Sequence, residues 1–118
     1  YGFESYVVGE TTTPAARARD LVIAASGRGH TAGVIHRARE ARALGARVFV
    51  FTSAEKSPLL DVANFSIVIK PPPGGSFQFG TNWFEQGLFL LLECVAHRLA
   101  RAKKVTFKKL LLRHANLE

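Results

Sequence analysis

The sequence contains no methionine and a single cysteine, Cys94. One cysteine excludes an internal disulfide and cannot form a zinc site by itself, so a reducing, cytoplasmic setting is expected. Apolar runs are short, and one such as Leu88 to Leu92 cannot cross a membrane. The first ten residues also lack the basic start and apolar stretch of a secretion signal. Because the chain begins in mid-pattern and has no methionine, we expect it to be a fragment of a longer protein.

Acidic residues are scarce as well: nine Asp and Glu stand against sixteen Lys and Arg, which gives a formal net charge of +7. This excess favours anionic partners, and phosphorylated metabolites, nucleic acid and acidic surfaces all qualify. The 118 residues, 47% hydrophobic and 21% charged, have the composition of one globular domain. Composition therefore restricts the charge of the partner but not the chemistry.

Strand and helix patterns alternate along the chain, which is typical of an α/β fold with a parallel sheet. Apolar and β-branched runs predict the strands, and apolar spacing of three and four residues predicts the helices. A loop rich in proline and glycine precedes the last long helix. The predicted strands span 6–8, 21–25, 47–52 and 65–69; the helices span 31–44, 57–63 with Ser57 as cap, and 82–102; a helical turn or two follows Thr106.

The most informative segment runs from Asp20 to Thr31, where an apolar run ends in a loop rich in serine, glycine and threonine that opens a helix. Glycines let the backbone turn sharply and approach a ligand, and a helix N-terminus favours an anion. These features predict a phosphate site, although a strand-to-helix turn without a ligand uses the same residue types. Thr52 and Ser53 end the next predicted strand, so they are expected near this loop.

Several blocks in the same order resemble the 6-phospho-3-hexuloisomerase family, within the sugar isomerase (SIS) domain superfamily. They are Val7 to Pro14, the loop from Ser26 to Thr31, 51–53 with 57–59, Gly80 with 84–86, and the closing 113–118. The Thr-Thr-Thr-Pro block and the His-Ala-Asn-Leu-Glu tail are the most specific. The resemblance implies a flavodoxin-like, three-layer α-β-α domain with a parallel sheet, over 1–118, that lacks the family's first strand and leading helix.

The resemblance also implies an activity and its residues. The expected reaction converts a 3-hexulose 6-phosphate to fructose 6-phosphate, in the ribulose monophosphate pathway, through an enediol and with no metal or organic cofactor. Glu85 would be the acid/base, and His114 would belong to a tail, 106–118, that completes a site or an interface. The substrate's phosphate would be held around Ser26, Gly27, Arg28, Gly29, Thr31, Thr52 and Ser53.

Two positions depart from the family's usual loop, Ser-Gly-Ser-Gly-Glu-Thr. Arg28 replaces the second serine and His30 replaces the glutamate. Arg28 either pairs with a phosphate through two parallel hydrogen bonds or fills the pocket. Glu85 has an alternative too, because a first-turn glutamate also complements the helix dipole.

Three further expectations follow. The altered loop leaves open a noncatalytic SIS module that only binds a phosphosugar, whereas nucleic-acid binding is disfavoured because no recognition motif accompanies the basic residues near the C-terminus. The apolar face of the long helix and the run Leu110 to Leu112 predict a homo-oligomer. Cys94, which lies among Leu91, Leu92 and Val95, is expected to be a buried, inert thiol.

Overall fold

A computed structural model describes residues 3–112 and 114. Three parallel strands form one sheet in the order β1-β2-β3. The sheet register places Ala24 beside Val50 and Val50 beside Ser66. The elements are β1 (Leu21–Ala25), α1 (Ala32–Ala43), β2 (Arg47–Thr52), the 3-10 turn η1 (Leu60–Val62), β3 (Phe65–Val68), α2 (Asn82–Ala102) and α3 (Phe107–Leu111).

The predicted strands 21–25, 47–52 and 65–69 and the predicted helices 31–44 and 82–102 are confirmed to within a residue at each end. The predicted helix over 57–63 is reduced to the single turn η1, although Ser57 does cap it, since its Oγ accepts the N–H of Leu60 at 3.3 Å. The helical turn after Thr106 is also confirmed as α3. Local sequence patterns thus predict the three strands of the sheet and the two long helices.

The core lies between α1 and one face of the sheet. Val48 and Val50 of β2 are fully buried there, against Ala38 and Ala41 of α1. Leu59, from the β2–β3 crossover, closes the same cluster. Small alanines on α1 let the helix lie close to the valines of the strands, which is how close packing is reached in a small core.

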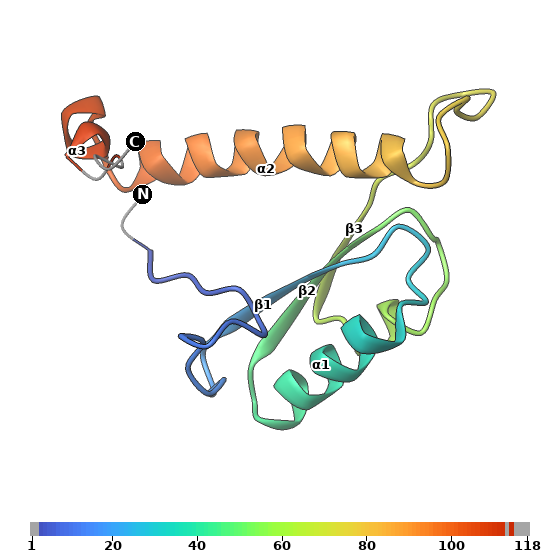
Figure 1. The fold of residues 1–118 in the computed structure, drawn as a ribbon, viewed down its shortest axis with the longest axis horizontal. Helices are drawn as coiled ribbons and strands as arrows, with labels where there is room; N and C mark the ends of the chain where they lie inside the picture. Colours follow the sequence, from blue (N-terminus) through green and yellow to red (C-terminus); the bar gives the residue numbers. More distant parts are fainter. Residues whose placement is uncertain (1–2, 113, 115–118) are drawn as a thin grey trace.

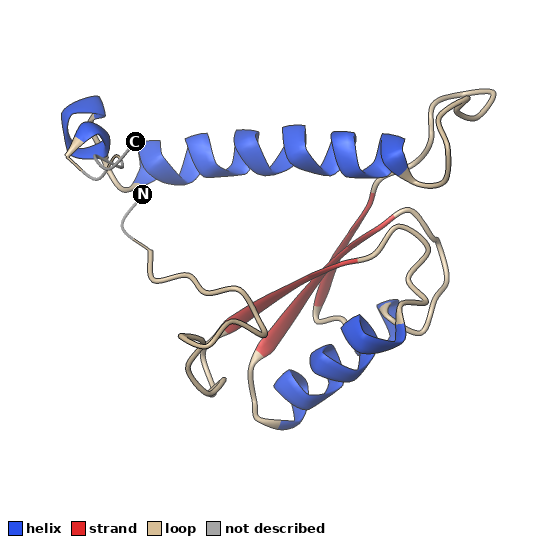
Figure 2. Cartoon of the chain, in the orientation of Figure 1, coloured by secondary structure: helices blue, strands red, loops and turns tan. Residues whose placement is uncertain are grey.

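The other face of the sheet is covered much less. Figures 1 and 2 show α1 and α2 on opposite sides of the sheet, which confirms the three-layer order. At its start α2 is packed, because Phe84 is 2% exposed and Gly87 lies against Ile69, and near its end Ala100 is 8% exposed; much of the helix between them is exposed. Leu21 and Ile23, on the α2 side of the sheet, remain 54% and 56% exposed.

The prediction of a strand over Tyr6–Val8 is wrong. These residues lie in an exposed loop that ends in a turn, in which Glu10 N–H donates to the Val7 carbonyl at 3.1 Å and the Thr13 hydroxyl donates to it at 2.5 Å. A strand needs a neighbour, and within the described residues β1 has one on its β2 side only. Phe3 instead places its ring 3.8 Å from the Lys103 ammonium, at the far end of α2.

The prediction of a buried Cys94 is also wrong, because its side chain is exposed. The predicted apolar face of α2 exists, but the sheet does not reach beyond its first turns. Leu92, Val95 and Leu99 are therefore 36%, 38% and 43% exposed. Among the described residues, no helix is long and apolar enough to cross a membrane.

Candidate functional site

The loop between β1 and α1 brings two hydroxyl groups together. Ser26 Oγ and Thr31 Oγ1 lie 3.0 Å apart, and the Gly29 N–H donates to Ser26 Oγ at 3.2 Å. Gly29 has a φ of +70°, which L side chains rarely adopt, so the glycine allows the turn. The hydroxyl pair stands at the start of α1, where the first N–H groups of a helix lack intrahelical partners, although the Val34 N–H here donates to the Thr31 carbonyl at 3.0 Å. This arrangement suits an anion of phosphate size.

Residues at the carboxyl end of β2 form hydrogen bonds to this loop. Thr52 Oγ1 donates to the Gly27 carbonyl at 3.0 Å, and the Ser53 N–H and hydroxyl donate to the same oxygen at 2.8 and 2.5 Å. The prediction that Thr52 and Ser53 lie beside the loop is therefore confirmed. Thr52 is fully buried, and its Oγ1 also accepts the Ala54 N–H at 3.2 Å. Its contacts hold the loop, and its expected contact with a phosphate stays a prediction.

The β2–β3 crossover supports the loop from the side. The Leu59 N–H donates to the Gly29 carbonyl at 3.3 Å. A side chain at Gly29 would collide with Ser57, whose Cβ lies only 2.5 Å from the position of an added methyl group. The loop is thus fixed by β2 and by the crossover before any ligand binds, which lowers the cost of ordering it around one. Arg28 and His30 extend from this fixed loop into solvent.

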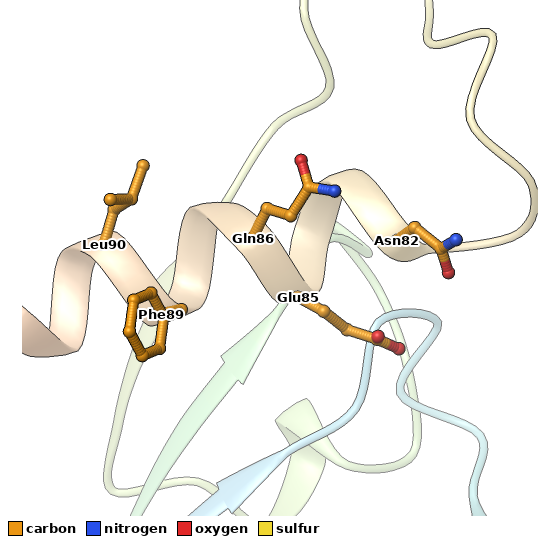
Figure 3. Close-up of a pocket in the computed structure, with 5 residues that line it drawn as sticks. All are labelled: Asn82, Glu85, Gln86, Phe89 and Leu90. Atoms are coloured by element: carbon orange, nitrogen blue, oxygen red, sulfur yellow. The ribbon is translucent and has the colours of Figure 1, made fainter.

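Helix α2 begins next to the same loop. Thr81, just before the helix, stands over Gly27: a methyl group added to that glycine would lie 2.6 Å from Thr81 Cγ2. Glu85 lies in the first turn, and its N–H donates to the Thr81 carbonyl at 3.1 Å. Figure 3 shows the Glu85 side chain pointing to the side of α2 on which the sheet lies, whereas Gln86 and Leu90 point away. Glu85 is exposed and lines an open depression along the helix with Asn82, Gln86, Phe89 and Leu90.

Comparison with known proteins assigns this arrangement to a family. The model of the SIS domain matches residues 5–84, which include the loop, the ends of all three strands and Thr81. The chain belongs to the SIS domain family. The rest of α2, which the match does not reach, carries Glu85 just beyond it.

Two relatives of this SIS domain and one solved structure are associated with the same enzyme activity. The chain is 40% identical to the 3-hexulose-6-phosphate isomerase of Mycobacterium gastri, over 100% of this chain and 62% of the relative. It is 34% identical to the protein of that name in Bacillus subtilis, over 99% and 67%. A crystal structure of a protein from Methanococcus jannaschii, for which a 3-hexulose-6-phosphate isomerase function has been inferred, matches with a TM-score of 0.83 at 28% identity, over 99% of this chain and 65% of that one. The SIS chain spans about two thirds of the length of each relative.

His114 is not part of this cluster. It is exposed and follows α3 in the sequence. Figure 1 shows α3 at the opposite end of α2 from the loop. The 21 residues of α2 span about 30 Å at a rise of 1.5 Å per residue, so His114 and Glu85 do not meet within one SIS chain. The remainder of the predicted motif 113–118 lies outside the described residues. No group of three or more His, Cys, Asp or Glu within the described part is placed to hold a metal ion.

Two residues of the site were not identified from the sequence in this role. The sequence indicates Ser57 only as a helix cap and as part of the family block 57–59, and it does not indicate Thr81, yet both side chains lie against loop glycines. The sequence signal for such contacts is the presence of glycines directly after a strand, because a glycine there indicates that another part of the chain approaches the backbone closely. The sequence does not identify that other part.

Proposed function

We propose that this SIS domain interconverts 3-hexulose 6-phosphate and fructose 6-phosphate. The observation that carries the proposal is that one loop holds the paired hydroxyls of Ser26 and Thr31 and also contacts the helix start that bears Glu85. Membership of the SIS family and the printed names of the relatives support the same reaction. As further parts of the proposal, residues 1–118 are one partial SIS domain, and the enzyme works in the cytoplasm without a metal or organic cofactor.

In the proposed complex, the phosphate accepts hydrogen bonds from the hydroxyls of Ser26 and Thr31 and from N–H groups of the loop and of the first turn of α1. Arg28, exposed on the same loop, adds a pair of parallel hydrogen bonds to the phosphate. Thr52 and Ser53 hold the Gly27 carbonyl and so keep the loop open toward its ligand. These contacts fix the phosphate end of the sugar and leave its carbonyl end to be reached from α2.

The chemistry then needs one base. The Glu85 carboxylate removes the proton on C2, the C–H electron pair forms the C2–C3 double bond, and the C3 oxygen takes up a proton to give the enediol. The C2 hydroxyl next loses its proton and becomes the carbonyl, while C3 receives a proton from the Glu85 carboxyl. His114 of a neighbouring copy transfers protons among the sugar oxygens, because an imidazole has one nitrogen that can donate a proton and one that can accept it.

A homo-oligomer is part of this proposal. Leu92, Val95 and Leu99 form an exposed apolar stripe on α2, and apolar surface of this kind marks interfaces. A dimer would bring the tail of one copy toward the site of another. Light scattering is expected to give at least twice the chain mass of 12.9 kDa, and a monomer at high concentration would contradict this part.

The direct test is turnover of 3-hexulose 6-phosphate by the chain, coupled to a dehydrogenase that consumes the product. Glu85→Gln is expected to lower kcat at least a hundredfold and to leave the Kd for fructose 6-phosphate within about threefold. Glu93→Gln changes another exposed glutamate on the same helix; it is the matched control and is expected to keep full activity. Equal activity of the Glu85→Gln variant would refute the proposed base.

A second candidate is a module that binds a phosphosugar without turnover. The observation in its favour is that Glu85 is exposed to solvent rather than enclosed, in a chain that covers 62% of its Mycobacterium gastri relative. This candidate predicts that fructose 6-phosphate raises the Tm of the chain while no product forms. Turnover that depends on Glu85 would exclude it.

A further inference from the structure

Gly27 is the point at which three parts of the site meet. Its carbonyl accepts hydrogen bonds from Thr52 and Ser53 at the end of β2. On the other side, the Thr81 side chain covers it so closely that an added methyl group would lie 2.6 Å from Cγ2, 2.8 Å from Cβ and 3.1 Å from Oγ1. Cβ atoms essentially never approach other atoms below 3.0 Å, so this fit requires glycine at 27. Loop and helix start are thus in contact at one position.

The same Thr81 fixes the backbone of the first turn of α2. Its carbonyl accepts the N–H of Phe84 at 2.8 Å and the N–H of Glu85 at 3.1 Å. Its hydroxyl makes no capping hydrogen bond within the described residues. The Thr81 side chain therefore acts through its packing against Gly27, while the Thr81 carbonyl holds the N–H of Glu85.

Little else holds this end of α2 against the sheet. Phe84 is buried, and a methyl group added to Gly87 would lie 3.4 Å from Ile69 Cγ2. Beyond these turns the helix is mainly exposed, with Phe89 and Leu90 each 65% exposed. Because few contacts hold this end of α2, the Gly27–Thr81 contact determines how far Glu85 lies from the loop.

We propose that Thr81 is a positioning residue, which sets the distance between Glu85 and a sugar held by its phosphate on the loop. The inference rests on the proposed function and deepens it. The phosphate at C6 fixes one end of a hexulose, and the base must reach C2 near the other end. A displacement of about 1 Å in such a geometry costs about a hundredfold in rate. The contact also couples the two ends, since a ligand that orders the loop orders the helix start through Thr81.

The test varies the shape of residue 81. Thr81→Val keeps the shape without the hydroxyl and is expected to keep kcat within about threefold. Thr81→Gly removes the contact and is expected to lower kcat at least tenfold with KM within about threefold, because the phosphate contacts remain. Glycine is well tolerated at the residue before a helix, so the helix itself persists. An equal loss in both variants, or a rise in KM alone, would overturn the inference.

A second arm needs no turnover and so separates this inference from the proposed function. Gly27→Ala is expected to push Thr81 away and to speed hydrogen exchange at the amides of Phe84 and Glu85 at least tenfold. Adding Thr81→Gly to Gly27→Ala is expected to remove the collision and to restore slow exchange. If the wild-type chain is inactive but this rescue occurs, the proposed function fails and the contact stands. Unchanged exchange in Gly27→Ala would refute the contact, whatever the activity.

Discussion

Gly29→Ala is the substitution with the most clearly calculable cost. Gly29 is buried and has a φ of +70°, and an added methyl group would collide with the Cβ and hydroxyl of Ser57. The left-handed conformation costs an L residue about 1–2 kcal/mol. Displacing Ser57 gives up its hydrogen bond to the Leu60 N–H, worth about 1 kcal/mol, and forces the crossover outward. We expect a loss of about 3 kcal/mol in the free energy of unfolding.

The matched control is Gly80→Ala. Gly80 has a φ of +61°, but an added methyl group there meets no atom within 4 Å. This variant carries the conformational cost alone, so we expect a loss of about 1 kcal/mol. For a chain of this size the difference corresponds to a Tm lower by roughly 6–10 °C in Gly29→Ala than in Gly80→Ala.

The assay is urea unfolding at 25 °C, followed by circular dichroism and by the fluorescence of Trp83, the only tryptophan. Coinciding transitions would license the free energies. Gly29→Ala combined with Ser57→Gly is expected to recover most of the collision cost, because the atoms that collide are gone. A Gly29→Ala variant as stable as Gly80→Ala would refute the view that the crossover presses on the loop.

Three further predictions concern other contacts. Asn64→Ala removes the Oδ1 that accepts the N–H of the fully buried Val48 at 2.8 Å, and we expect urea unfolding to give a loss of about 1–3 kcal/mol. Cys94, being exposed, is expected to react with a thiol reagent in the folded chain as fast as in urea, whereas slow labelling would contradict its exposure. The Lys70 ammonium, 2.8 Å from the exposed Glu55 carboxylate, lowers the pKa of Glu55, and Glu55 in turn raises the pKa of Lys70. The pair therefore stabilises the fold between the ordinary pKa of Glu55, 4.5, and that of Lys70, 10.5, and its contribution is lost as the pH falls through the lowered Glu55 pKa or rises through the raised Lys70 pKa. Because both groups are exposed, we expect this contribution to be small. A Glu55→Gln variant whose Tm at pH 7 equals that of the wild type, with and without 1 M salt, would confirm this.

Much of the fold follows from local patterns in the sequence. The apolar run of β2 and the spacing of apolar residues in α2 predict these elements to the residue. Tyr6–Val8 has the same local character as a strand, but it has no neighbour to pair with, and pairing is decided by distant parts of the chain. Cys94 is exposed for a related reason: an apolar helix face indicates that something covers it, not that the chain's own sheet does.

The site divides in the same way. Ser26 and Thr31 are close in sequence and were predicted together, and Thr52 and Ser53 were placed near them by the rule that parallel strands end at one edge. Thr81 lies 54 positions beyond Gly27, and no local pattern connects the two. Such contacts depend on the path of the whole chain and are found only from the structure.

The unpaired edge of β1 also bears on how the protein behaves in solution. Leu21 and Ile23 are more than half exposed beside backbone groups that have no strand partner on that side in the described chain, which is a template for pairing with a second copy. The net charge of +7 opposes such encounters. The Debye length shrinks from about 10 Å in 0.1 M salt to about 3 Å in 1 M salt. Added salt is therefore expected to weaken the repulsion that keeps these edges apart and to make concentrated solutions of this chain turn cloudy.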